Sequence, residues 1–158
     1  MTDSARVILI REGRLILIER VRQEQTYYVF PGGRMEPDET PEQTAIREVR
    51  EEVGLHVALE RKVAEVYLRN IGSLQHYFLG QVLGGSFGSG DGPEILGLYP
   101  PERGLYRPVE IEMQQVLRED VRSRRVCQLV VECWQVGWPK PIQYYVESSP
   151  SASFKERR

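Results

Sequence analysis

Two closely spaced apolar runs open the chain and predict paired strands. Residues 6–11 and 15–19 are rich in branched aliphatic side chains, and a Glu-Gly turn signal separates them at residues 12–13. This pattern predicts a β-hairpin with both strands substantially buried. Residues 27–30 predict a third short strand, which the following Pro-Gly-Gly sequence ends.

An amphipathic helix is expected over residues 41–53. Thr40 is a favourable N-cap, Pro41 suits the first helical position, and Gln43 completes a capping box. Gly54 follows as a C-cap glycine. The apolar stripe of this helix consists of Ala45, Ile46, Val49 and Val53.

Residues 55–68 and 74–83 alternate in polarity and predict two antiparallel strands. The glycine-rich residues 84–92 predict a flexible loop and not a phosphate cradle, because no strand-glycine-helix order and no Gly-Lys-Ser/Thr sequence follow. Residues 105–113 predict another strand, and Pro108 places it at a sheet edge or next to a bulge.

A second helix is expected over residues 119–136, and the serine-rich residues 148–158 predict a disordered tail. Strands around two helices indicate one α/β layered domain over residues 1–147, and a chain of 158 residues has the length of a single domain. The aromatic stretch 134–145 is interpreted either as core or as the surface of a homodimer.

Composition excludes several classes of protein. The chain has 21 Lys and Arg against 23 Asp and Glu, a near-neutral balance that argues against a partner such as long nucleic acid but not against nucleotides. No apolar run approaches the roughly 18–20 residues of a membrane span, and the N-terminus lacks a secretory pattern. Cys127 and Cys133 fall on different faces of the expected helix, which predicts reduced thiols in a cytoplasmic protein.

Negative charge is concentrated in one segment. Residues 31–55 contain seven acids and three arginines. At about 100° per residue, Glu48, Glu51 and Glu52 project within one sector of the helix, where their repulsion costs stability unless a cation lies among them. Oxygen ligands suit Mg²⁺ or Mn²⁺ better than zinc. The alternative is a solvated acidic helix face, the usual meaning of a charge run.

The spacing around these acids favours the metal site. Residues 33–55 fit the pattern G-x5-E-x7-R-E-U-x-E-E-x-G-U, where U is aliphatic, at every fixed position. The matching residues are Gly33, Glu39, Arg47, Glu48, Val49, Glu51, Glu52, Gly54 and Leu55. This pattern is the Nudix box, and the chain resembles the Nudix hydrolases to about residue 117 and more weakly to residue 147.

The resemblance implies an α/β/α sandwich with a mixed sheet, in which the box forms a loop-helix-loop. It also implies metal-dependent hydrolysis of a nucleoside diphosphate linked to another moiety, with one of the acids as the base. The metal ligands it implies are Glu48, Glu51, Glu52 and the carbonyl of Gly32. The residues that it implies brace the box are Gly33, Glu39, Arg47 and Gly54.

Family members often add a further catalytic acid from a loop beyond the box. The best candidate here is Glu94, with Asp91 and Glu110 behind it, and the alternative for Glu94 is a solvated loop acid. No acid lies within residues 106–109, where some relatives place it, so the identity of the base is left open.

Substrate contacts are expected from the first strands. Tyr28 lies three residues before Pro31, where many family members place an aromatic residue that meets the nucleobase. Adjacent strand residues face opposite ways, so one of Tyr27 and Tyr28 is expected in the core. Arg6 and Arg20 are candidates for phosphate contact, and a salt-bridged surface arginine is the alternative for each.

The substrate signatures of ADP-ribose, dinucleoside polyphosphate, coenzyme A and NADH hydrolases are absent downstream of the box. This favours the MutT-like branch, and hence a (d)NTP or an oxidised nucleotide as substrate. The alternatives are an ADP-ribose or nucleotide-sugar pyrophosphatase and a non-catalytic nucleotide-sensing module.

Overall fold

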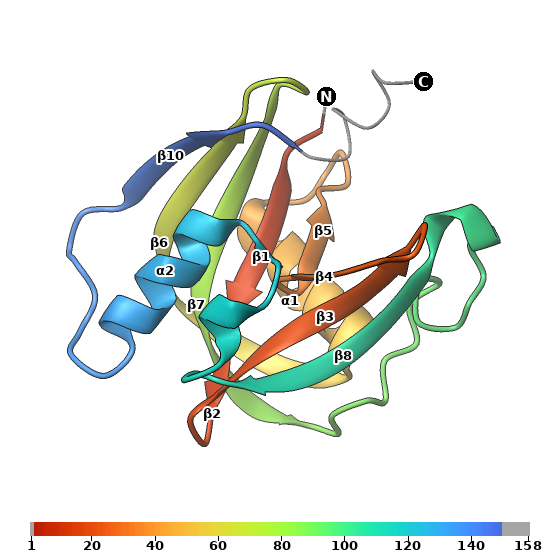
Figure 1. Ribbon diagram of the computed structural model, residues 1–158, viewed down its shortest axis with the longest axis horizontal. Helices are drawn as coiled ribbons and strands as arrows, with labels where there is room; N and C mark the ends of the chain where they lie inside the picture. Colours follow the sequence, from red (N-terminus) through yellow and green to blue (C-terminus); the bar gives the residue numbers. More distant parts are fainter. Residues whose placement is uncertain (1, 150–158) are drawn as a thin grey trace.

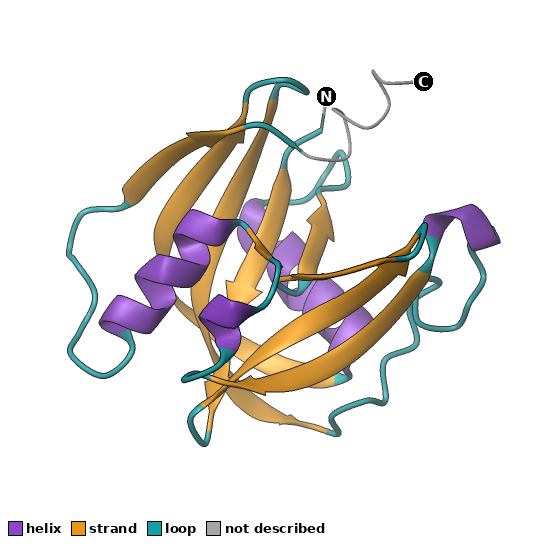
Figure 2. Ribbon diagram, in the orientation of Figure 1, coloured by secondary structure: helices purple, strands orange, loops and turns teal. Residues whose placement is uncertain are grey.

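The computed structural model describes residues 2–149 and contains two five-stranded sheets with a helix on each side (Figures 1 and 2). The first sheet has the order β10 (Gln143–Glu147), β6 (Leu55–Leu68), β7 (Ser73–Gly85), β1 (Ser4–Ile8) and β5 (Gly32–Arg34). The second has the order β2 (Ile10–Arg11), β3 (Arg14–Arg22), β4 (Gln25–Val29) and β9 (Val121–Arg122), with β8 (Leu105–Glu112) paired to β3. Parallel and antiparallel pairs occur in both sheets, so the expected mixed α/β architecture is confirmed.

Alternating side chains divide the core between the two helices, α1 (Pro41–Val53) and α2 (Arg124–Cys133). Val7 and Ile16 pack in the cluster that contains the buried face of α1, whereas Ile8 and Leu15 pack in the cluster that contains the buried face of α2. Successive strand residues point to opposite faces, so one continuous apolar run contributes side chains to both core clusters, one for each helix.

Local sequence fixes the ends of α1 where they are expected. The Thr40 hydroxyl accepts a hydrogen bond from the Gln43 amide at 3.2 Å, and the Gln43 side chain accepts one from the Thr40 amide at 2.9 Å. Gly54 adopts a left-handed conformation with φ of 84° and donates its amide to the last turn. The capping box and the C-cap glycine therefore determine where this helix begins and ends.

The expected N-terminal hairpin is wrong in its first half. The run over residues 6–11 divides at Leu9: β1 joins the first sheet between β7 and β5, and only β2 pairs with β3. Ile8 and Leu9 are buried on both faces of the chain, which lets the strand pass from one sheet to the other. The short strand β5 is not among the predicted strands, because the Pro-Gly-Gly sequence predicts the end of a strand there.

The expected second helix is too long at both ends. Ser123 caps α2, since its hydroxyl accepts a hydrogen bond from the Val126 amide at 3.3 Å, and the preceding residues form β9 beside β4. The 3₁₀ turn η2 (Val116–Arg118) comes before them, and a second one, η1 (Pro101–Arg103), precedes β8. The chain after α2 supplies β10, which pairs with β6.

The remaining predicted strands are confirmed. β6 and β7 are antiparallel as predicted, and β8, which carries Pro108, pairs with β3 alone among the described strands.

The start of the expected C-terminal tail is hydrogen-bonded to the fold. Ser149 exchanges two hydrogen bonds with Asn70, at 2.8 and 3.0 Å, while residues 150–158 of the expected tail lie outside the described residues. Cys127 and Cys133 are buried and unpaired. Neither helix within residues 2–149 is long and apolar enough to cross a membrane.

Candidate functional site

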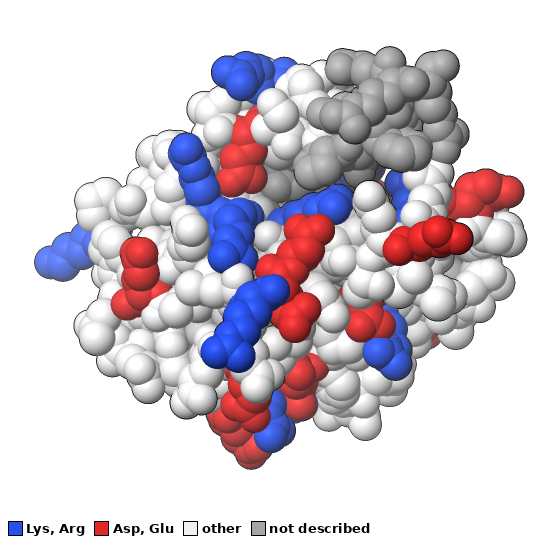
Figure 3. Space-filling view, in the orientation of Figure 1, with Lys and Arg blue, Asp and Glu red and all other residues white. Residues whose placement is uncertain are grey.

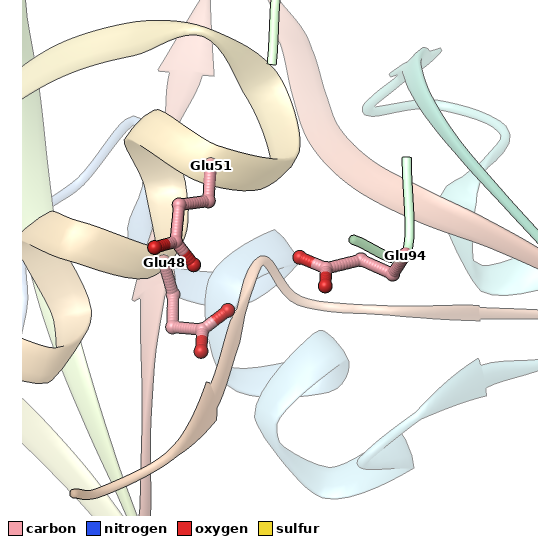
Figure 4. Close-up of side chains that lie close together, drawn as sticks. All are labelled: Glu48, Glu51 and Glu94. Atoms are coloured by element: carbon pink, nitrogen blue, oxygen red, sulfur yellow. The ribbon is translucent and has the colours of Figure 1, made fainter. Parts of the chain in front are cut away.

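Three carboxylates converge in a cleft between α1 and the loop that follows β7. Glu48 and Glu51 project from α1, and Glu94 reaches toward them from that loop (Figure 4). One carboxylate oxygen of each lies within 4.8 Å of the other two. One oxygen of Glu94, Oε1, is buried without a hydrogen-bond partner among the described residues. Convergent carboxylate oxygens, one of them lacking a donor, fit a hard divalent cation such as Mg²⁺ or Mn²⁺.

Burial makes Glu48 and Glu94 difficult to ionise without a cation. It raises the pKa of Glu48 to about 7, although the nearby Arg47 guanidinium opposes that shift. Burial also raises the pKa of Glu94, and the charge of Glu51 adds to the effect. A cation among the three oxygens would favour the charged forms.

Glu52 occupies a separate position at the floor of the cleft. Its side chain is buried, and Oε1 accepts a hydrogen bond from the Gly32 amide at 2.7 Å. Burial raises the pKa of this carboxyl well above its usual range. The expected ligand group thus divides, with Glu48 and Glu51 beside Glu94 and with Glu52 fixed to β5.

The two glycines of β5 let its backbone lie close to β1 and to the Glu48 side chain. Gly32 has φ of 154°, and an added Cβ would lie 2.1 Å from the Ala5 carbonyl oxygen. At Gly33 an added Cβ would lie 2.6 Å from the Glu48 carboxyl. Neither position accepts a side chain while β5 stays paired to β1 and Glu48 stays in the cleft.

Arg47 connects the loop before α1 to the acidic helix face. Its Nε and Nη2 donate to the two oxygens of Glu39 at 2.7 and 2.9 Å, and its Nη1 donates to Glu48 at 3.0 Å and to Glu51 at 3.1 Å. The hydrogen bond from Arg47 lowers the pKa of Glu39 to about 2. The two-pronged contact with Glu39 supplies the connection between loop and helix that the box predicts.

The glycine-rich loop lies docked on the C-terminal end of α1. The amides of Ser86, Gly88 and Gly92 donate to the carbonyls of Gly54, Val53 and Glu51 at 3.1, 2.8 and 2.9 Å. An added Cβ at Gly92 would lie 2.6 Å from Oε1 of Glu94. The loop was expected to be flexible. Its glycines instead satisfy unpaired helix carbonyls and bring Glu94 to the cleft.

A cavity of about 270 Å³ adjoins the cleft on the other side of Glu52. Two of its walls are flat cation–aromatic pairs: the Arg122 guanidinium lies 3.9 Å from the centre of the Tyr27 ring, and that of Arg20 lies 3.6 Å from the centre of the Tyr106 ring. Its polar lining includes Arg6, Gln75, Tyr77, Ser123 and Glu147. Flat walls and a few polar groups are typical of small-molecule sites.

The structure brings some of the expected substrate residues to this cavity and leaves others away from it. Arg6 and Arg20 line it, and Arg6 donates to the Phe30 carbonyl at 2.7 Å. Tyr28 does not: its ring packs against the core cluster of α2, and its hydroxyl donates to Glu19 at 3.3 Å. The neighbouring Tyr27 lines the cavity instead, because adjacent strand residues face opposite ways.

The other acids considered for Glu94's position lie elsewhere. Asp91 is exposed, and Glu110 is paired with Arg11 at 2.8 Å. Gln75, Tyr106 and Glu147 line the cavity without a signal in the sequence. No motif marks them, and only the sheet topology brings them together.

Charge on the visible face is distributed evenly. In Figure 3 acidic and basic side chains lie interspersed over the sheet and helix surfaces. The acidic cleft is in turn bordered by cations, since Arg20, Arg34 and Arg103 also line it. A ligand that carries phosphates would therefore meet positive charge opposite the carboxylates.

Comparison with known proteins yields consistent matches. A family model described as the NUDIX domain matches residues 1–120. A "Putative 8-oxo-dGTP diphosphatase" of Bacillus subtilis (strain 168) is 36% identical over 97 residues, which cover 61% of this chain and 64% of that protein. An "ADP-ribose pyrophosphatase" of the same organism is 33% identical over 123 residues, which cover 73% of this chain and 60% of that protein.

A crystal structure of a NUDIX hydrolase from Nitrosomonas europaea superposes with a TM-score of 0.72 at 20% identity, covering 94% of this chain and 79% of that one. This likeness concerns the fold. The matched regions span less than two thirds of the length of both curated relatives.

Proposed function

This chain belongs to the NUDIX domain family, and from that premise we propose that it is a metal-dependent hydrolase of phosphoric anhydride bonds in nucleotides. The proposed substrate is a nucleoside diphosphate linked to a further group, most simply a (d)NTP or its oxidised form, cleaved to a nucleoside monophosphate and pyrophosphate. The observation that carries the proposal is the convergence of the Glu48, Glu51 and Glu94 oxygens within 4.8 Å.

The cleft residues would share the work as follows. Glu48, Glu51 and Glu94 would hold Mg²⁺ or Mn²⁺, with Glu52 and the Gly32 carbonyl beside them. A bound divalent ion supplies positive charge that polarises phosphoryl oxygens and neutralises the leaving phosphate. One of the carboxylates accepts the proton of the attacking water.

The remaining residues would orient the substrate. Arg20 and Arg103 line the cleft near the acids and are placed to meet phosphate oxygens. Tyr27 and Tyr106, with the guanidinium groups that lie over their rings, line the adjoining cavity, where flat groups of this kind could pack against a nucleobase. The chain needs no covalent nucleophile for this reaction.

Two substrate branches have support. The missing downstream signatures and the likeness to an 8-oxo-dGTP diphosphatase favour triphosphates. The likeness to an ADP-ribose pyrophosphatase, which covers more of this chain, favours ADP-ribose or a nucleotide-sugar as the second candidate. The products separate them: pyrophosphate from a triphosphate, and AMP with a sugar phosphate from ADP-ribose.

The test is a hydrolysis screen with Mg²⁺ or Mn²⁺ and with a chelator. The panel contains canonical and oxidised (d)NTPs, ADP-ribose, nucleotide-sugars and dinucleoside polyphosphates. We expect metal-dependent cleavage that falls by roughly 10²- to 10⁴-fold in Glu51→Gln, because a cleft carboxylate is lost. Glu42→Gln, which alters an exposed acid on the same helix, is the matched control and is expected to retain the activity.

Absence of cleavage across the panel by folded, metal-supplied protein would overturn the proposal. It would favour a nucleotide-sensing module instead.

A further inference from the structure

We propose that Glu147 reads the hydrogen-bonding edge of the nucleobase and makes the cavity selective for guanine. The inference rests on the proposed function, because the cavity adjoins the carboxylate cleft and shares Glu52 with it. It concerns a residue at the end of β10, outside the segment that the family pattern covers.

The Glu147 carboxylate is held in place before any ligand arrives. The hydroxyl of the buried Ser123 donates to its Oε2 at 2.6 Å, and its backbone carbonyl accepts a hydrogen bond from the Arg69 amide at 2.8 Å. β10 itself is paired to β6. A half-buried carboxylate held by the Ser123 hydroxyl, on a strand whose backbone is itself hydrogen-bonded, is preorganised to accept hydrogen bonds within the cavity.

The pattern of donors on each base decides which edge a carboxylate prefers. Guanine presents two adjacent donors, N1–H and the N2 amino group, which together match the two oxygens of a carboxylate. Adenine and cytosine present one amino donor beside a ring nitrogen acceptor, which a carboxylate repels. Uracil and thymine present one donor between two carbonyl acceptors. Guanine is therefore the base that Glu147 can bind through two hydrogen bonds.

Gln75 supplies the complementary donor. Its side-chain carbonyl accepts a hydrogen bond from the Tyr77 hydroxyl at 3.2 Å, so its NH₂ group is the part that remains to donate. Both residues line the same cavity as Glu147. The O6 carbonyl of guanine is an acceptor next to N1–H, and it would take this donor.

The walls of the cavity suit a flat purine. The Arg122–Tyr27 and Arg20–Tyr106 pairs present planar groups to the cavity. Stacking on such surfaces does not depend on the identity of the base. Discrimination among bases would thus come mainly from Glu147, with Gln75 as the complementary donor. Because 8-oxoguanine keeps N1–H and the N2 amino group, the proposal applies equally to oxidised guanine.

The test measures binding without turnover. Full-length protein is titrated calorimetrically with GMP, IMP, XMP and AMP without added metal. We expect GMP to bind at least about 10-fold more tightly than XMP and AMP, with IMP between them because it lacks the N2 amino group. In Glu147→Gln the ratio of GMP to XMP affinity should fall by about 10- to 100-fold, because an amide pairs with the N1–H and O2 of xanthine.

Two further variants serve as controls. Glu147→Asp keeps the charge and should retain a preference for GMP over XMP. Glu132→Gln changes a carboxylate on α2 that does not line the cavity and should leave all four affinities unchanged. Equal binding of GMP, IMP and XMP by the native protein, or an unchanged ratio in folded Glu147→Gln, would overturn the inference.

The experiments distinguish failure of the proposed hydrolase function from failure of the base-reading role of Glu147. Guanine-selective binding with no hydrolysis of any nucleotide would contradict the hydrolase and support the base-reading role. Hydrolysis with no preference among bases would support the hydrolase and contradict the base-reading role.

Discussion

Most of the carboxylate cleft comes from one continuous stretch of chain, residues 32–52, whereas the cavity beside it draws its lining from strands far apart in the sequence. Local contacts hold the first region: the capping box at Thr40 and the Arg47 bonds to Glu39 join residues at most eight positions apart. Sheet pairing holds the second, where β10 brings Glu147 beside Ser123. The residues proposed for chemistry are thus encoded locally, and those proposed for selectivity are encoded by the whole fold.

Glu94 is the exception among the carboxylates of the cleft. It reaches the α1 carboxylates only because the glycine-rich loop docks on the end of that helix. The site therefore contains both kinds of residue, those positioned by local contacts and those positioned by the tertiary fold. Substitutions of the two kinds should have different effects.

The largest effect on stability should come from the local region. Arg47→Leu leaves Glu39, Glu48 and Glu51 without the guanidinium that they share, and breaking such a mostly buried pairing should lower the free energy of unfolding by about 3 kcal/mol. Urea denaturation without metal measures it. Arg50→Leu removes the same charge from an exposed position of α1 and should cost less than about 0.5 kcal/mol. Equal losses of unfolding free energy in the two variants would contradict the idea that the Arg47 contacts stabilise this region.

The next effect should fall on turnover. Glu94→Gln removes the one cleft carboxylate that tertiary structure supplies, and kcat should fall by roughly 100-fold. Steady-state kinetics on the best nucleotide of the panel measures this change. Asp91→Asn, in the same loop but exposed, should retain kcat.

Gly92→Ala tests the docking of the loop itself. The new methyl group would displace Glu94, so kcat should fall in the same direction. Gly84→Ala meets no atom within 4 Å and serves as the control. Unchanged kcat in both Glu94→Gln and Gly92→Ala would remove Glu94 from the site.

A smaller effect should appear on substrate affinity. Tyr27→Leu removes a flat wall of the cavity, and KM should rise by about 10-fold with kcat nearly unchanged. Tyr28→Leu alters the neighbouring residue on the opposite face and should leave KM unchanged in folded protein. A rise in KM in Tyr28→Leu alone would restore the expectation made from the sequence.

The smallest effect should be a pH dependence of stability. The pKa of Glu39 is lowered to about 2 by Arg47, below its usual value of 4.5. Its stabilising contribution is therefore complete above pH 4.5 and is lost as the pH falls through the range from 4.5 to 2. The difference in unfolding free energy between native protein and Glu39→Gln, about 1 kcal/mol near neutral pH, should shrink over that range. A difference that stays constant with pH would show that the ion pair does not stabilise the fold.

The sequence predicted α1 with both of its ends and the antiparallel pair β6 and β7, and it placed Pro108 at a sheet edge or next to a bulge. Through the family resemblance it also predicted Glu39 and Arg47 as braces of the box. Each of these depends on side chains and backbone groups that are neighbours along the chain, or on the intrinsic limits of proline and glycine. Periodicity and spacing are sufficient to reveal them.

The switch of the chain between sheets at Leu9, the start of α2 at Arg124, and the choice of Tyr27 over Tyr28 for the cavity required the structure. A continuous apolar run records that a strand is buried on both faces but not which strand pairs with it. The sequence by itself determined the acidic helix and its bracing, because those contacts close within one or two turns of chain. Only tertiary structure decided where Glu94 and Glu147 lie, because loop docking and strand pairing between distant segments leave no local pattern.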